Sequence, residues 1–234
     1  MKIFAISDLH LPGTSIKPMD VFGVQWDRHQ DKIQENWNKI VSQEDLVLIP
    51  GDISWAMTLA DARGDLDFIG ELPGRKIILR GNHDYWWSSV SRIRQIVHPS
   101  IEALQNNAFK IGNVVICGTR GWLCPGRDST AEDEKIYNRE CIRLKLSLDA
   151  AMPLCTGGEE LIVMLHYPPR VEGIGERDFI HILEQYPVNQ VIYGHVHGPK
   201  FSAVFAGLHD RTQYNLVSCD YIDFSPMLIY DEKK

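Results

Sequence analysis

Short apolar runs, most of them ending in aspartate, asparagine or histidine, recur along this chain and constrain its fold more than any other feature. The runs are rich in aliphatic and β-branched residues, and each predicts a buried strand. They span Ile3–Ser7, Leu46–Pro50, Lys76–Leu79, Val114–Cys117, Leu161–Leu165 and Val191–Tyr193. Apolar residues at near-helical spacing over 33–41 and 59–69 predict amphipathic helices between the strands. Strands and helices that alternate in this way predict an α/β fold.

The second half of the chain carries further helix signals. Ser88 predicts the cap of a third helix, and Thr130 with Asp133 resembles a capping box that opens a fourth. Residues 179–186 predict a shorter helix. After Pro199, shorter alternating segments predict a closing antiparallel sheet. These segments cover 201–205, 215–218 and 227–230.

Five of the predicted strands run directly into a polar motif at their carboxyl ends, the edge at which open α/β sheets bind ligands. Aspartate and asparagine oxygens and neutral imidazole are ligands that Mn, Fe and Zn accept, and no cysteine stands in these motifs. One such motif alone is as typical of a turn or of a hydrogen-bonded core histidine, but five at strand ends favour a metal site. Glycines 51, 81 and 194 each precede a ligand and are expected to let the backbone turn sharply. The motifs are Asp8-Leu9-His10, Gly51-Asp52, Gly81-Asn82-His83-Asp84, His166 and Gly194-His195-Val196-His197.

Composition narrows the class of protein. The chain has 234 residues and a formal net charge of -7, with a pI near 5.7, so one domain over residues 1–234 is expected. The acidic balance argues against a nucleic-acid or anionic-membrane surface. The first apolar run is too short for a signal peptide or a membrane span. Five cysteines without CxxC spacing favour reduced thiols and a cytoplasmic location.

The order and type of these motifs resemble the calcineurin-like metallophosphoesterases, whose motifs run D-x-H, G-D, G-N-H-[DE], an isolated His and G-H-x-H. The match spans positions 8–197. The resemblance implies a four-layer α/β fold of two packed mixed β-sheets flanked by α-helices, and it implies two divalent metal ions (Mn, Fe or Zn). One ion would be held by Asp8, His10 and His197, and the second by Asn82, His166 and His195. Asp52 would bridge both.

The implied activity is hydrolysis of a phosphate ester, because a metal pair clamps the phosphate and lowers the pKa of a bridging water. His83 matches the proton donor of the family, which would protonate the leaving group. Its alternative role is structural support for Asn82.

One departure from the protein phosphatases of the family bears on the substrate. Those enzymes carry a G-D-x-x-D-R-G pattern, whereas here the run is Gly51-Asp52-Ile53-Ser54-Trp55-Ala56, and the later motif ends in Asp84 in place of glutamate. We therefore expect a small phosphate mono- or diester as substrate, as in bacterial small-substrate phosphohydrolases and cyclic-nucleotide phosphodiesterases.

Aromatic and arginine side chains near the motifs are candidates for substrate binding, because rings stack on bases and guanidinium groups bind phosphate. Packing at the sheet edge is the alternative for each of them. The candidates are Arg80, Tyr85, Arg120 and Trp122, followed by Trp55, Trp86, Tyr167, the Pro168–Arg170 turn and a loop over Cys124–Ser129.

Two other functions compete with a small-substrate phosphohydrolase. A nuclease would share the metal site, but the chain lacks a basic, aromatic-rich tract. A non-catalytic scaffold with the same fold would have lost metal ligands or His83, all of which are present. The sequence leaves the oligomeric state open.

Overall fold

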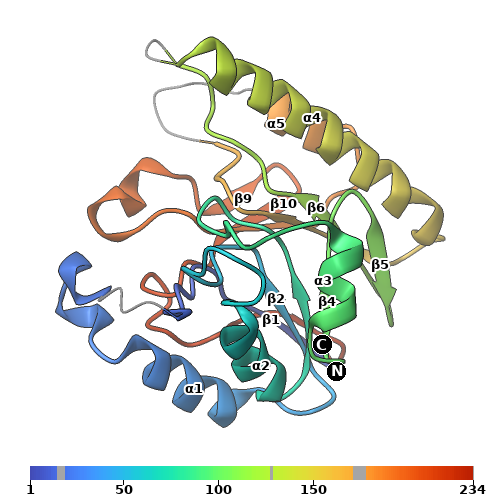
Figure 1. Ribbon diagram of the computed structural model, residues 1–234. Helices are drawn as coiled ribbons and strands as arrows, with labels where there is room; N and C mark the ends of the chain where they lie inside the picture. The colour runs from blue at the N-terminus through green and yellow to red at the C-terminus, as the bar shows by residue number, and fades with distance from the viewer. Residues whose placement is uncertain (15–18, 127–128, 171–177, 234) are drawn as a thin grey trace.

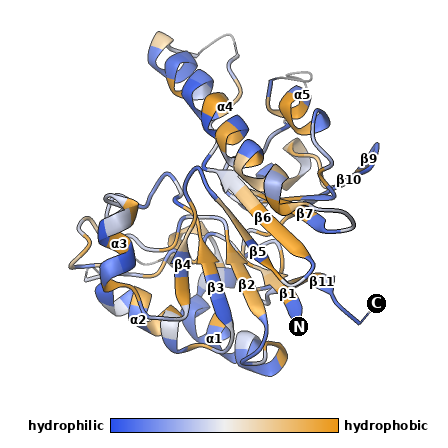
Figure 2. Cartoon of the chain, turned by 90° about the vertical axis from the view of Figure 1, so that its right-hand side faces the viewer, coloured by the Kyte–Doolittle hydropathy of each residue, from blue (hydrophilic) through white to orange (hydrophobic). Residues whose placement is uncertain are grey.

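Two mixed β-sheets lie face to face, with helices on both outer sides (Figures 1 and 2). The computed structural model describes residues 1–14, 19–126, 129–170 and 178–233. Within these residues the expected four-layer α/β arrangement is confirmed.

The first sheet has the strand order β11-β1-β2-β3-β4. Strands β1 to β4 run parallel, whereas β11 pairs antiparallel with β1 and places Lys2 opposite Asp231. The strands span Lys2–Ala5 (β1), Leu46–Ile49 (β2), Arg75–Ile78 (β3), Ile101–Ala103 (β4) and Met227–Asp231 (β11).

The second sheet has the order β5-β6-β7-β8-β10-β9. Its four central strands are parallel, and both edge strands are antiparallel to their neighbours. The strands span Ala108–Ile111 (β5), Val114–Thr119 (β6), Glu160–Leu165 (β7), Gln190–Tyr193 (β8), Gly207–His209 (β9) and Thr212–Leu216 (β10).

The central strands are apolar throughout because both of their faces are covered. In β2, Val47 and Ile49 pack toward helices, whereas Leu46 and Leu48 pack toward the other sheet. Successive strand side chains point to opposite faces, so an unbroken apolar run is what a strand between two layers requires.

Helices cover the two outer faces (Figure 2). Trp37 of α1, Leu66 of α2 and Ile93 of α3 belong to the core outside the first sheet, whereas Leu144 of α4 and Phe179 of α5 pack on the second sheet. The α-helices span His29–Ile40 (α1), Arg63–Glu71 (α2), Val90–Ile96 (α3), Ala131–Ala151 (α4) and Asp178–Glu184 (α5). The 3-10 helices span Met19–Phe22 (η1), Val24–Trp26 (η2), Met152–Leu154 (η3) and Gly198–Ala203 (η4). Among the described residues, none of the helices combines the length and hydrophobicity that crossing a membrane requires.

The two predicted helix caps had different outcomes. The capping box of α4 is confirmed, with the Thr130 hydroxyl accepting from the Asp133 backbone and the Asp133 carboxylate accepting from the Thr130 backbone. The prediction for Ser88 is wrong, because α3 is preceded by Ser89, whose hydroxyl lies 3.2 Å from that of Ser91 and caps no backbone N–H.

The closing antiparallel sheet predicted after Pro199 is wrong as a separate sheet, although β10 and β11 each make one antiparallel pair, with β9 and β1. Residues 201–205 overlap η4, where Pro199 stands at the start and favours a helical turn. Strand β10 runs parallel to β8 in the second sheet, and β11 joins the first sheet instead. The last third of the chain therefore contributes to both sheets.

Candidate metal centre

The polar motifs of the sequence meet at one edge of the sandwich. Asp8 follows β1, Asp52 follows β2 and Asn82 follows β3, all in the first sheet. His166 follows β7 and His195 follows β8, both in the second sheet. Because the two sheets pack face to face, the carboxyl ends of these parallel strands bring the side chains together between them.

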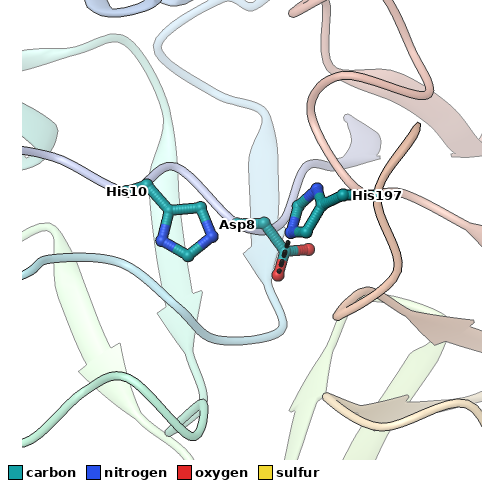
Figure 3. Close-up of side chains that lie close together, drawn as sticks. All are labelled: Asp8, His10 and His197. Atoms are coloured by element: carbon teal, nitrogen blue, oxygen red, sulfur yellow. Dashed lines mark ion pairs between the residues drawn. The ribbon is translucent and has the colours of Figure 1, made fainter. Parts of the chain in front are cut away.

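A first group contains Asp8, His10 and His197. Each offers one ligand atom, and the three atoms lie within 4.8 Å of one another. Figure 3 shows the Asp8 carboxylate between the two imidazoles, with one oxygen 3.5 Å from His197 Nε2. His10 Nδ1 is buried and has no hydrogen-bond partner among the residues that the structure describes. An unpartnered buried nitrogen is costly unless a ligand binds it.

A second group contains Asp52, Asn82, His166 and His195. Asn82 Oδ1 lies 2.7 Å from His166 Nε2 and 2.8 Å from His195 Nδ1. One oxygen of Asp52 lies 3.5 Å from the same His166 nitrogen. The structure thus brings together all the residues that the resemblance assigned to metal binding.

The protonation of His166 indicates what this second group binds. Its Nδ1 lies 3.0 Å from the Pro50 carbonyl, which only accepts, so Nδ1 carries the proton. Burial lowers the pKa of His166 to about 3, so the ring is neutral and Nε2 presents a lone pair. That lone pair faces the oxygens of Asn82 and Asp52, which are acceptors as well. A cation among these atoms would turn mutual repulsion into coordination, so the donor set fits a divalent metal ion.

Burial and neighbouring charges shift the pKa values of Asp52 and Asp8 in opposite directions. Burial, followed by the negative charges of Asp84 and Asp8, raises the pKa of Asp52 well above its usual value. Burial acts in the same direction on Asp8, but the hydrogen bond and charge of His197 outweigh it and lower the pKa of Asp8. A bound cation would stabilise the ionised form of both carboxylates.

Four of these residues have backbone conformations that L-residues rarely adopt. The φ angle is 59° at Asp8, 45° at His10, 51° at Asp52 and 73° at His195. Left-handed conformations cost of order 1–3 kcal/mol at non-glycine residues and occur where a functional site over-determines the backbone. The strand ends are therefore held in strained turns that direct the side chains inward.

Two glycines supply space and not the turn itself. A Cβ on Gly81 would lie 2.1 Å from Asp52 Oδ1, and one on Gly194 would lie 2.2 Å from Asp8 Oδ2. From the sequence, Gly51, Gly81 and Gly194 were each expected to let the backbone turn sharply. Gly51 does so, with a φ of 101°, whereas after Gly194 the positive φ belongs to His195, and Gly81 and Gly194 let carboxylates approach the backbone.

Asp220 is a site residue that belongs to none of the sequence motifs. Its Oδ1 lies 2.8 Å from His197 Nδ1, and its Oδ2 accepts from the Gly198 backbone at 3.2 Å. Burial would lower the pKa of His197, but the hydrogen bonds to Asp220 and Asp8 raise it to about 10. Asp220 follows β10 at the same edge of the sheet, so the strand-end argument applied to 215–218 would have found it.

Asp84 joins the loops that carry the second group. Its Oδ1 accepts hydrogen bonds from the backbone of Ile53 (2.9 Å) and Ser54 (3.2 Å) and from Trp86 Nε1 (2.9 Å). Its Oδ2 accepts from the Gly81 backbone at 2.7 Å. Burial raises the pKa of Asp84, but a set of four N–H donors suits the ionised carboxylate.

His83 lines a cavity of about 120 Å³ beside the metal-ligand groups. Its backbone N–H donates to Asp52 at 2.8 Å, and its ring centroid lies 4.5 Å from that of Trp55. Trp55 in turn stacks on His10 at 4.8 Å. Aromatic packing thus helps to orient His83. The described residues that line the cavity are His10, Met19, Phe22, Trp26, Asp52, Trp55, His83, His195 and His197.

The four candidates for substrate binding divide between two places. Tyr85 is 53% exposed, and its ring lies 6.3 Å from that of His83. Arg80, Arg120 and Trp122 line a second, larger pocket. The second pocket adjoins the metal-ligand groups but does not contain them.

The remaining candidates also differ in position. The ring of Tyr167 packs at 4.1 Å on that of His195, whereas Arg170 lies over Phe205, 5.2 Å from the ring centroid. The predicted loop over Cys124–Ser129 includes Arg127 and Asp128, which lie outside the described residues.

Comparison with known proteins decides the family. The model of the calcineurin-like phosphoesterases matches residues 1–199. The chain belongs to this family. This calcineurin-like phosphoesterase is also 38% identical over 86 residues to the Gene 66 protein of Mycobacterium phage D29, and 32% identical over 78 residues to that of phage L5. The matches cover 35% and 33% of the chain, and only 40% and 37% of those curated relatives.

Solved structures with the same fold match the phosphoesterase over nearly its whole length. A protein of unknown function from Aquifex aeolicus has a TM-score of 0.54 at 18% identity, with 97% of this chain and 95% of that one covered. Phosphopantetheinyl hydrolase from Mycobacterium tuberculosis has a TM-score of 0.54 at 13% identity, with 100% and 97% covered. At these identities the likeness concerns the fold.

Proposed function

We propose that this phosphoesterase hydrolyses small phosphate esters with two divalent ions bound at the edge of the sandwich. Asp8, His10 and His197 would hold one ion. Asn82, His166 and His195 would hold the other, and Asp52 would contact both. The observation that carries the proposal is the convergence of Asn82 Oδ1, the unprotonated His166 Nε2 and an oxygen of Asp52 on one point of the site. When bound, such ions neutralise phosphate charge and make hydroxide available near neutral pH.

The residues of the chain would position the reaction. Asp220 holds the ring of His197 through Nδ1 and leaves Nε2 on the side of Asp8. His83 lines the cavity with the ligand residues, where its imidazole would give a proton to the leaving alkoxide. Trp55 packs on His83 and would keep the imidazole in place.

The proposed substrate is a small molecule. The cavity at His83 is about 120 Å³, which is smaller than a pocket for a drug-sized ligand. A metal-dependent hydrolase is also consistent with the phosphopantetheinyl hydrolase that shares the fold. We further propose that residues 1–234 act as one domain in the cytoplasm, where the free thiols of the five cysteines would remain reduced.

Metal removal and restoration test the proposal. The purified chain is stripped of metal, reloaded with Mn, Fe or Zn, and assayed on p-nitrophenyl phosphate and bis-p-nitrophenyl phosphate. We expect turnover only with metal, and its loss in Asp52→Ala together with a lower bound-metal content. Bound metal without turnover on either substrate or on a panel of small phosphate esters would refute the proposal.

Leaving-group dependence tests the role of His83. We expect His83→Ala to lower kcat for alkyl phosphates by roughly 10²–10⁴-fold, the usual contribution of general acid catalysis. The loss should be much smaller for p-nitrophenyl phosphate, because nitrophenolate leaves without a proton. An equal loss on both substrates would contradict proton donation and would indicate support of Asn82.

A further inference from the structure

A basic pocket lies beside the metal centre in this acidic protein. Its volume is about 410 Å³, and among the residues that the structure describes, four arginines and one carboxylate, Glu140, line it. The arginines are Arg80, Arg120, Arg139 and Arg143. With a formal net charge of -7 over the whole chain, such a local excess of positive charge favours an anionic ligand.

The carboxylate in the pocket is already engaged by other groups. Glu140 is fully buried and lies 2.7 Å from Arg143 Nη1 and 3.8 Å from Arg139 Nε. Its other oxygen accepts from the Thr119 hydroxyl at 2.7 Å. Two of the four arginines are therefore paired within the protein.

Arg80 and Arg120 are not paired in this way. The Nε atoms of both are buried, and neither has a hydrogen-bond partner in the described part of the chain. The Arg120 guanidinium lies 4.7 Å from the centroid of the Trp122 ring, which fixes its plane but supplies no anion. A buried N–H without an acceptor is unfavourable, so a ligand that brings an anionic acceptor to these guanidinium groups would be stabilising.

The pocket and the metal centre share the same strand ends. Arg80 directly precedes the Gly81-Asn82 motif, and the Arg120 carbonyl accepts from the backbone of His166 at 2.9 Å. The Trp122 ring lies 5.1 Å from Tyr167, whose ring lies 4.1 Å from that of His195. Backbone and ring contacts therefore connect the residues of the pocket directly to those of the metal-ligand groups.

We propose that the Arg80–Arg120 pocket binds a second anionic group of the substrate, so that the preferred substrates are small phosphate esters that carry another phosphate. This inference rests on the proposed hydrolase function and specifies its substrate class. The guanidinium groups offer several donors in a planar arrangement that suits phosphate. Asn106 Oδ1 is also buried in this pocket without a partner among the described residues, and it would accept from a hydroxyl between the two phosphates.

Binding of inorganic pyrophosphate to the metal-stripped chain of 234 residues tests the pocket independently of catalysis. We expect calorimetric titration to show binding that weakens at least tenfold in Arg120→Gln and in Arg80→Gln, with partial recovery in Arg120→Lys. The matched control is Arg75→Gln, since Arg75 is exposed and paired with Glu102 at 2.8 Å. Equal binding in all variants, or none in the wild-type protein, would overturn the proposal.

Substrate selectivity tests whether the anion belongs to the substrate. With Mn restored, we expect kcat/KM for a sugar bisphosphate to exceed that for the matching monophosphate by at least tenfold, and Arg120→Gln to remove this ratio. If pyrophosphate binds but activates monophosphate hydrolysis without any bisphosphate preference, the pocket holds a separate effector and the proposal is wrong. If pyrophosphate binds in the metal-free chain but the loaded chain hydrolyses neither substrate, the hydrolase function fails, and the substrate class inferred from it is withdrawn.

Discussion

Replacing Asp84 with asparagine should destabilise the loops that hold Asp52 and Asn82. The Asp84 carboxylate accepts four N–H donors, three on Oδ1 and one, from Gly81, on Oδ2. Asparagine has nearly the same shape but only one acceptor oxygen. If that oxygen replaces Oδ1, the new amide NH₂ faces the Gly81 N–H, donor against donor.

The expected cost follows from these contacts. A hydrogen bond to a charged acceptor contributes roughly 1.5–3 kcal/mol, and a buried donor left without a partner costs about 1–3 kcal/mol. We therefore expect Asp84→Asn to lower the free energy of unfolding by about 3 kcal/mol. For a chain of this length, that corresponds to a fall in Tm of roughly 6–12 °C.

Thermal and urea unfolding of the metal-free protein measure the effect without contributions from ion binding. Asp67→Asn is the control, because Asp67 is half-exposed and makes one 3.7 Å ion pair with Arg63. We expect that control to change stability by less than about 0.5 kcal/mol. A Tm for Asp84→Asn within 1 °C of wild type would show that Asp84 is protonated in the native state, and the reasoning from four donors would be refuted.

Three further predictions concern other parts of the structure. Asp220→Asn should weaken metal binding about 10–100-fold, because the His197 ring loses the carboxylate that orients it. Titration with metal measures the affinity, and Tm should change little. An unchanged affinity would exclude this role of Asp220. Gly194→Ala should destabilise the fold by about 1–3 kcal/mol, because the new Cβ would lie 2.2 Å from Asp8 Oδ2. Gly64→Ala should stabilise the fold by up to about 1 kcal/mol, because Gly64 lies in α2 with open space around it. The reverse order of stabilities in urea unfolding would contradict the argument from these contacts. Burial lowers the pKa of Lys76 to about 8 from 10.5, so the unfolded chain binds more protons between these values and stability should rise with pH across that window. Urea unfolding at pH 7.5 and 9.5 should show this rise, and a similar rise in Lys76→Met would assign it to other groups.

The sequence predicted the strands that carry the site because their signal is local. β2 and β7 are buried on both faces, so their apolar runs are continuous and end where the backbone turns out of the sheet. The strands β4, β5 and β9 have three or four residues and partly exposed side chains, and no comparable run marks them.

Residues that depend on tertiary contacts were harder to find. Asp220 lies 23 positions from His197, and only the parallel pairing of β10 with β8 brings them to one edge. The metal-ligand groups were predictable because each motif stands at a strand end. The separation of Arg120 from the His83 cavity depends on side-chain direction, which the sequence does not specify.

The left-handed turns at Asp8, His10, Asp52 and His195 imply a conflict between metal binding and conformational stability. Glycine adopts these φ angles without steric cost and would also remove buried charge or a buried, unpartnered imidazole nitrogen. Replacing one of these residues with glycine is therefore expected to give a protein with a higher Tm and no activity. If variants were selected for thermal stability alone, and not for turnover, these side chains would be among the first to be replaced.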